Sequence, residues 1–286
     1  MRMHSVVEKF NSLAKKKHPF KYLISVLLKR SGLSTLFTIK KEGYKLRFYP
    51  SALSGALWVD LHSRHADEKF LRDYLRPGDV VVDVGANVGS LTLEASVIVG
   101  DSGKVFAIEA HPKTFEYLWG NIELNQVKNV CACNVALGDA EGAVLFSDTA
   151  LDDQNSVITD GDGVKVPMHQ LDRLPIDGRR IDLLKVDVEG YEKFVLQGAR
   201  QTLQITECIY FESWEQHFQK YGYTCNDLFE FLNSCGFQLF KISQETIIFP
   251  VPKGYISINN ENLLAIRNLD RFLQRTSFRL ESNCEI

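Results

Sequence analysis

A short glycine-containing loop follows an apolar segment near residue 85. Residues 80–84 (VVVDV) have the composition of a buried strand, and residues 85–89 (GANVG) lead from it into a helix. Ligands of open α/β sheets bind at this carboxyl end of the strands. Gly85 and Gly89 allow a ligand to approach the backbone, and Asp83 places a carboxylate at the strand end. The loop therefore predicts a ligand site, with a tight turn that binds nothing as the structural alternative.

The ligand is better predicted as a nucleoside-linked methionine than as a dinucleotide. The dinucleotide pattern G-x-G-x-x-G needs a second glycine two residues after the first, and Asn87 stands there. The Asp83 carboxylate would suit the cationic amino group of a methionine moiety better than a pyrophosphate. We therefore expect S-adenosyl-L-methionine as cofactor, held by Asp83, Gly85, Asn87 and Gly89. An NAD-type oxidoreductase and a non-catalytic module that binds an adenosyl ligand are the alternatives.

The next two predicted strand ends belong to the adenosyl side of the site. Glu109 ends the second strand about one βα unit after the loop, where a carboxylate can accept hydrogen bonds from both ribose hydroxyls. A third strand, over residues 130–137, would end beside the adenine ring. Ala136 and Leu137 could face the base, and Asp139 could meet its amino group. Because Leu-Gly-Asp is also a common turn, the role of Asp139 stays open.

Acidic residues at the fourth and fifth strand ends are candidates for the chemistry. Methyl transfer from a sulfonium needs an aimed nucleophile and removal of its proton. Asp187 is the first candidate for the base or for the group that orients the acceptor, and Glu212 and His217 come next. The structural alternatives are that Glu189 only caps a helix, that Glu212 pairs with Lys185, and that His217 lies on a helix surface.

We expect no metal in this site. Asp187, Glu189 and Glu212 could together offer hard oxygen ligands to magnesium or calcium, but no spacing requires an ion. The six cysteines contain no CxxC pair, and no histidine spacing suggests zinc.

The elements that must position these residues alternate between strand and helix. The sequence predicts strands over 80–84, 104–109, 130–137, 181–186, 208–211, 237–242 and 262–267, and helices over 62–75, 90–99, 112–125, 192–203 and 227–235. Strands that are apolar throughout and alternate with helices indicate a parallel sheet covered on both faces. Between residues 142 and 174 short strands over 144–146 and 164–167 replace the expected helix, so we predict an insertion at the sheet edge.

Length and composition favour one α/β domain with appendages. The 286 residues are 45% hydrophobic and 24% charged, which suits a single large core. We divide the chain into an N-terminal extension over 1–75 that packs on the core, a methyltransferase domain over 76–268 and a C-terminal tail over 269–286. The net charge of −3 gives no general attraction to a polyanion, so nucleic acid is not an expected partner.

The N-terminal region carries a basic and apolar stretch. Lysines 15–17 precede apolar residues over 22–28, followed by Lys29 and Arg30. Such a segment could lie on an anionic membrane surface, but we favour a helix packed on its own domain. No apolar run is long enough to span a membrane, and the cysteine usage suits a reducing compartment, so we expect a cytoplasmic protein. The oligomeric state is left open.

Six sequence motifs together resemble the FkbM-type methyltransferase family. They are VDVGANVG at 82–89, AIEAHP at 107–112, NIELN at 121–125, NVALGD at 134–139, LDRL at 171–174 and IDLLKVDVEGYE at 181–192. The similarity covers about residues 75–215, and the glycine loop combined with KVDVEGYE is its most specific part.

The resemblance implies a fold, an activity and a class of acceptor. The expected fold is a doubly wound, Rossmann-like and mostly parallel seven-stranded sheet of the class I methyltransferase type, with an N-terminal helix and strand extension. The expected activity is methyl transfer from S-adenosylmethionine to an oxygen. The acceptor would be a hydroxyl on a sugar, a glycan or a glycosylated small molecule.

Overall fold

The structure is a computed structural model that describes residues 18–147, 155–158, 161, 163–176, 180–243 and 246–281. Lysines 15–17 of the basic stretch and the end of the predicted tail lie outside these residues.

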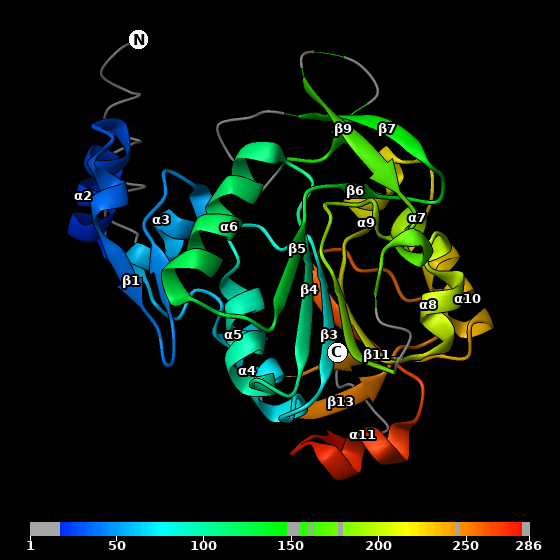
Figure 1. Cartoon of the computed structure of the whole chain (residues 1–286). Coiled ribbons are helices and arrows are strands. Elements are labelled where there is room, and N and C mark those ends of the chain that lie inside the picture. The colour runs from blue at the N-terminus through cyan, green and yellow to red at the C-terminus, as the bar shows by residue number, and fades with distance from the viewer. Residues whose placement is uncertain are drawn as a thin grey trace.

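A nine-stranded sheet forms the centre of the molecule (Figure 1). Its strands, in chain order, are β3 (Val80–Val84), β4 (Lys104–Ile108), β5 (Val130–Cys133), β10 (Ile181–Val186), β11 (Thr206–Ser213), β12 (Gln238–Ile242), β13 (Ile247–Pro250), β14 (Glu261–Ile266) and β15 (Arg279–Leu280). Their order across the sheet is β15-β13-β12-β14-β11-β10-β3-β4-β5. The strands from β11 to β5 are mutually parallel, whereas β14 runs antiparallel to both β11 and β12.

The predicted α/β class is confirmed, but the predicted number of seven strands is wrong. The chain adds β13 antiparallel to β12, and β15 then pairs in parallel with β13. β15 has only two residues, and β13 ends in a proline, which cannot donate a backbone hydrogen bond to a neighbouring strand. Neither strand therefore has a clear signature in the sequence. They extend the sheet at the edge opposite β5.

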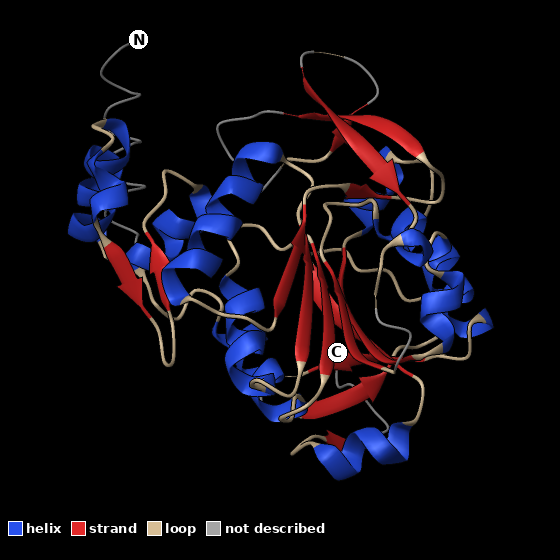
Figure 2. Ribbon diagram, viewed as in Figure 1, coloured by secondary structure: helices blue, strands red, loops and turns tan. Residues whose placement is uncertain are grey.

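Helices cover both faces of this sheet, as Figure 2 shows. On one face lie α4 (His65–Tyr74), α5 (Ser90–Val99), α6 (Pro112–Asn125) and α11 (Leu269–Arg275); on the other lie α7 (Glu192–Gln197), α8 (Arg200–Gln204), α9 (Glu215–Lys220) and α10 (Cys225–Ser234). Two separate hydrophobic cores result, one on each side of the strands. This double covering is why the central strands are apolar on both faces.

The predicted helix over 192–203 is broken into α7 and α8 at Gly198. A Cβ atom there would lie 1.9 Å from the backbone oxygen of Gly138, so only glycine fits this close approach. The approach brings the second helix layer against the chain that follows β5.

A second, four-stranded sheet lies above the carboxyl ends of the central strands. It has the order β6-β9-β7-β8, with β6 at Ala136–Leu137, β7 at Gly142–Ser147, β8 at Val157–Ile158 and β9 at Gly163–His169. The insertion predicted at 144–146 and 164–167 is thereby confirmed. The single strand predicted over 130–137 is wrong, because the chain leaves the main sheet after Cys133 and pairs residues 136 and 137 with β9.

The N-terminal elements are α2 (Pro19–Arg30), a 3₁₀ turn (Leu33–Leu36), β1 (Thr38–Lys40), β2 (Lys45–Arg47) and α3 (Ala52–Val59). Of these, β2 and α3 pack against α6 and α5, whereas α2 packs on α3. Leu46, Phe48 and Leu57 share a buried cluster with Leu93 of α5. None of the helices in the described residues is long and apolar enough to cross a membrane.

A buried ion pair joins the two central strands. Lys185 of β10 stands opposite Asp83 of β3 in the strand register, and its Nζ lies 3.1 Å from Asp83 Oδ1. Burial alone lowers the pKa of the Lys185 ammonium, but the carboxylates of Asp83 and Asp187 offset this and raise it above its usual value. Thr92 also donates to Asp83, at 2.6 Å. Lys185 is therefore charged in the core between two strands.

Removing this cation should destabilise the fold. Lys185→Met leaves the buried Asp83 charge without its partner, so we expect the free energy of unfolding to fall by about 3 to 5 kcal/mol. Urea denaturation measures it. The double variant Asp83→Asn/Lys185→Met should recover much of the loss, and Lys193→Met, which removes one member of a partly exposed pair at 4.0 Å, should cost under about 1 kcal/mol. Equal effects of the two lysine substitutions would contradict the assignment.

Candidate active site

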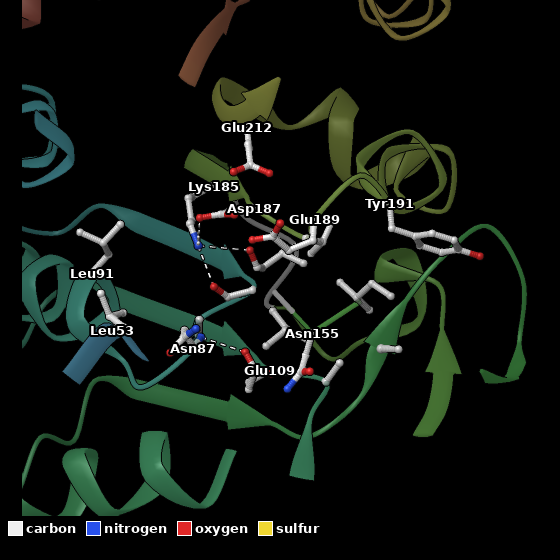
Figure 3. A pocket seen from close by; sticks show the side chains of 18 of the residues that line it. Leu53, Asn87, Leu91, Glu109, Asn155, Lys185, Asp187, Glu189, Tyr191 and Glu212 are labelled. Carbon is white, nitrogen blue, oxygen red and sulfur yellow. Dashed lines mark hydrogen bonds and ion pairs between the residues drawn. The ribbon is translucent and has the colours of Figure 1, made fainter. Parts of the chain in front are cut away.

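A cavity of about 280 Å³ opens at the carboxyl ends of the central strands. Its lining comes from the ends of β3, β4, β10 and β11, from the second sheet and from the N-terminal elements. Figure 3 shows Glu109 on one side of this cavity and Asp187, Glu189 and Glu212 on the other. The sheet topology thus brings together residues that are more than a hundred positions apart in the chain.

The glycine loop forms one wall through its backbone. Gly85 and Asn87 both line the cavity and both have positive φ angles, of 78° and 51°. A Cβ at Gly85 would lie 1.9 Å from the Asp187 carbonyl oxygen, so glycine is needed where the loop passes the end of β10. Gly89 instead caps α5 with a φ of 86° and packs against Leu118. Its position is structural, and it forms no part of the described lining.

Glu109 occupies the wall beside the loop. Its two carboxylate oxygens accept backbone hydrogen bonds from Asn87 N at 2.8 Å and His111 N at 2.9 Å. Burial raises the pKa of Glu109 to about 7, although these two hydrogen bonds oppose the rise. A carboxylate has about four acceptor positions, so two remain for hydroxyl groups in the cavity. Glu109 thus lies as the sequence predicted, with its donors already fixing its orientation.

Ala136 and Leu137 lie on the cavity wall next to Glu109, but Asp139 does not. The two apolar residues are buried at the start of the second sheet and give this corner an apolar surface. Asp139 is exposed, and its backbone oxygen accepts a hydrogen bond from the Gln170 side chain. The turn at residues 137–139 therefore has the structural role that the sequence left as the alternative for Asp139.

Asp83 lies beneath the cavity and forms no part of its described wall. Its side chain is almost fully buried between Lys185 and Thr92. The Asp83 carboxylate is therefore too deeply buried for the contact with a methionine amino group that the sequence predicted. Asp83 acts through Lys185, which donates to the Gly85 carbonyl at 2.8 Å and so fixes the loop that does line the cavity.

Asp187 faces the cavity between two cations. Its Oδ2 lies 3.7 Å from Lys185 Nζ and 3.6 Å from Arg64 Nη2, as an extension of the Asp83 pair. Its backbone N donates to Val84 O, which ties the end of β10 to that of β3. The carboxylate is therefore held at a defined position in the cavity wall.

Glu189 adopts a backbone conformation that side chains rarely take. Its φ is 55°, and Gly190 follows with a φ of 100°. A Cβ at Gly190 would lie 2.8 Å from the backbone oxygen of His217, so the glycine lets this loop pack directly on α9. The consequence is that Glu189 Oε2 lies 3.4 Å from His217 Nδ1. Glu189 faces the cavity, and Glu192 is the residue that accepts from the backbone N of Val188 and Gly190.

Glu212 lines the far wall of the cavity, and His217 lies behind it, outside the described lining. Glu212 accepts a hydrogen bond from the Asn260 side chain at 2.6 Å, and its other oxygen lies 3.7 Å from His217 Nδ1. His217 is buried against Trp214, with ring centroids 4.0 Å apart, so it is no surface residue. The sequence left open a pairing of Glu212 with Lys185. In the structure Lys185 instead pairs with Asp83 and Asp187.

Several lining residues lie outside those predicted from sequence. Arg64 comes from the start of α4 and Leu53 and Ala56 from α3, all in the predicted N-terminal extension, and Asn155 and Asn260 come from distant loops. No spacing in the sequence connects these positions with the strand ends. Lys185 belongs to the KVDVEGYE motif, but the motif alone does not indicate that its ammonium is buried and contacts Asp83, Asp187 and the Gly85 carbonyl.

The cavity fits an adenosyl cofactor on its Glu109 side. The oriented carboxylate supplies acceptors for a ribose diol, and the apolar surface of Ala136 and Leu137 beside it suits a purine ring. Gly85 and Asn87 line the cavity beside Glu109, where they could meet the methionine chain that is joined to the ribose.

Comparisons with known proteins identify the family of this chain. The sequence profile described as "Methyltransferase FkbM domain" matches residues 83–239, more than half of the chain. Hexuronic acid methyltransferase AglP of Haloferax volcanii is 27% identical over 193 residues, which cover 65% of this chain and 78% of that protein. A probable cobalt-precorrin-6B C(15)-methyltransferase of Saccharolobus solfataricus is 36% identical over 73 residues, covering 26% of this chain but only 35% of that protein.

Among solved structures, the methyltransferase FkbM of Methylobacillus flagellatus aligns with a TM-score of 0.43 and 14% identity, over 74% of this chain and 54% of that one. A likeness at this level carries no functional argument. The profile match shows the family, because it covers more than half of the chain. The chain belongs to the FkbM methyltransferase family and uses S-adenosyl-L-methionine as its cofactor.

Proposed function

We propose that this protein transfers a methyl group from S-adenosylmethionine to a hydroxyl group on a sugar, a glycan or a glycosylated small molecule. The observation that carries the proposal is the division of one cavity into two sides. Glu109 with the apolar corner suits the adenosyl group, and the carboxylates of Asp187, Glu189 and Glu212 face the remaining space. The similarity to a protein named as a hexuronic acid methyltransferase supports a sugar acceptor.

The acceptor side has groups suited to bind and orient a hydroxyl. Sugars present several hydroxyl donors, and carboxylates are strong acceptors for them. When bound, the cofactor supplies an electrophilic methyl group for in-line attack by the acceptor oxygen. Asp187, held by Lys185 and Arg64, then orients the hydroxyl and receives its proton on a carboxylate oxygen as the new carbon–oxygen bond forms.

A labelling experiment tests the proposed function directly. The purified protein is incubated with S-adenosylmethionine carrying an isotopically labelled methyl group and with fractionated extract of the source cell, and mass spectrometry identifies the labelled product. A methyl ether on a sugar hydroxyl supports the proposal. A label on nitrogen, carbon or a protein side chain rejects the O-methylation, and absence of transfer in every fraction favours a non-catalytic binding module.

Glu109 should make cofactor binding pH-dependent. Because burial raises the pKa of Glu109 to about 7, the Glu109 carboxyl of the cofactor-free protein is largely protonated below that pH. Ribose hydroxyls donate stronger hydrogen bonds to the ionised carboxylate than to the protonated acid. The affinity for S-adenosylhomocysteine should therefore be constant above pH 7 and weaken below it, by up to about tenfold per pH unit. Calorimetry between pH 5.5 and 8.5 measures this.

The isosteric variant assigns the effect to this residue. Glu109→Gln should lose about 1 to 3 kcal/mol of binding free energy at pH 8 and bind with little change across the range. Glu141→Gln, which alters an exposed glutamate outside the cavity, is the matched control. A pH slope that persists in Glu109→Gln would place the titrating group elsewhere, and NAD binding as tight as that of S-adenosylhomocysteine would reject the assignment of this pocket.

Asp187 should affect turnover more than cofactor affinity. Asp187→Asn keeps the shape of the side chain and removes its basicity, so we expect the methyl-transfer rate to fall by at least about a hundredfold. The dissociation constant for S-adenosylmethionine should change by less than about threefold. Single-turnover kinetics and calorimetry measure the two quantities.

The competing assignment lies on the fifth-strand side of the cavity. If Asp187→Asn keeps near-normal turnover while Glu212→Gln or His217→Ala abolishes it, the base is on β11 or α9. Thermal unfolding of each variant serves as the control, because Asp187 also contacts Lys185 and Arg64.

A further inference from the structure

Three side chains converge at the edge of the cavity away from Glu109. They are Glu189 in the loop after β10, Glu212 in β11 and His217 in α9, and one oxygen or nitrogen of each lies within 4.8 Å of the others. His217 Nδ1 is 3.4 Å from Glu189 Oε2 and 3.7 Å from Glu212 Oε2. Two ligand atoms that share one metal ion at about 2.1 Å are roughly 3 to 3.5 Å apart. The separation of 3.4 Å falls in this range, and that of 3.7 Å lies just above it.

Two of these atoms are buried without a hydrogen-bond partner among the described residues. They are Glu212 Oε2 and His217 Nδ1, and the two residues are only 7% and 8% exposed. A buried polar atom left in this state destabilises the fold, because it has lost its hydrogen bonds to water. The orientation is nevertheless fixed, because Asn260 donates to the other oxygen of Glu212 and Trp214 packs on the imidazole. Both unsatisfied atoms point into the space between the three side chains.

Glu189 and Glu212 place two carboxylates around this space, and the described lysine and arginine of the cavity wall contact other carboxylates. Of the cavity cations, Lys185 is engaged by Asp83 and Asp187, and Arg64 by Asp67 and Asp187. Behind the cluster, burial and the charge of Glu212 raise the pKa of Glu192 to about 8. A positive charge between Glu189 and Glu212 would relieve this concentration of carboxylates.

We propose that Glu189, Glu212 and His217 bind a divalent metal ion at the wall of the cavity. Imidazole nitrogen combined with two carboxylate oxygens suits first-row ions such as Mn²⁺, Fe²⁺ or Zn²⁺ better than Mg²⁺ or Ca²⁺, which prefer oxygen alone. The assignment replaces the expectation of no metal and has His217 in the ligand set where the sequence had suggested Asp187. Glu189 and Glu212 both line the cavity, so open coordination positions would face the bound acceptor.

A metal here also has a chemical use, which rests on the proposed function. A hydroxyl that coordinates a divalent cation loses its proton more readily, and the ion holds its oxygen in a defined place. Asp187, which lines the same cavity, would receive that proton. Binding of the ion itself needs neither cofactor nor acceptor and is tested without them.

The test is Mn²⁺ binding by the full-length protein after treatment with a chelator. Electron paramagnetic resonance of free Mn²⁺ during titration with MnCl₂ should reveal one saturable site per chain. Glu189→Gln, Glu212→Gln and His217→Ala should each weaken binding by at least about tenfold. His169→Ala is the matched control, since His169 pairs with Glu141 at 2.6 Å on the surface and should leave binding unchanged.

Thermal unfolding checks that each variant is folded. Glu189 is the most exposed of the three ligands, so Glu189→Gln decides the question if a change at the more buried Glu212 or His217 prevents folding. No saturable binding by the intact protein overturns the proposal and favours a protonated His217 that bridges the two carboxylates. Binding that all three substitutions leave unchanged also overturns it. Saturable binding without methyl transfer to any hydroxyl would reject the proposed function and leave the metal site standing.

Discussion

The Lys185 ammonium lies where the glycine loop and the ends of β3 and β10 meet. It pairs with Asp83 on the neighbouring strand, donates to the Gly85 carbonyl and reaches Asp187 at the edge of the cavity. A buried cation is stable only when several groups of opposite charge surround it, and the strand register provides them. The same contacts fix the backbone that would meet the cofactor and the carboxylate that would meet the acceptor. The positions of both sides of the site therefore depend on one buried charge.

Close backbone approaches at two glycines also fix the loops around the site. Gly85 lets the loop pass the end of β10, and Gly190 lets the next loop pack on α9, each at a place where a Cβ would collide with a carbonyl oxygen. Between them, Glu189 accepts an unfavourable φ of 55°. Such a conformation costs of order 1 kcal/mol and persists only when its surroundings impose it. Here the packing of Gly190 on α9 imposes the conformation, and it places the Glu189 carboxylate beside His217.

The sequence predicted the parts of the fold that depend on local pattern. The bounds of β3, α5, α6 and β10 agree with prediction because each element is a continuous apolar or amphipathic run with a clear turn at its end. Pattern could not tell that Ala136 and Leu137 leave the main sheet, since pairing with β9 is a contact across more than thirty residues. For the same reason Arg64 and Asn260 were missed in the site. Asp83 was recognised as important, but its burial under the loop depends on Lys185, which stands about a hundred positions away.

The two cations of the cavity wall lie on the same side, and this asymmetry limits what the acceptor can be. Lys185 and Arg64 both contact Asp187, so that part of the wall is close to neutral, whereas Glu189 and Glu212 form an acidic part beside it. An acceptor that carries a carboxylate of its own would be repelled from the acidic part, because like charges inside a cavity repel with little screening by solvent. A neutral polyol would not be. A divalent cation bound by Glu189, Glu212 and His217 would neutralise the two carboxylates and remove this repulsion. Occupancy of this position would therefore decide whether an anionic sugar can bind beside the cofactor.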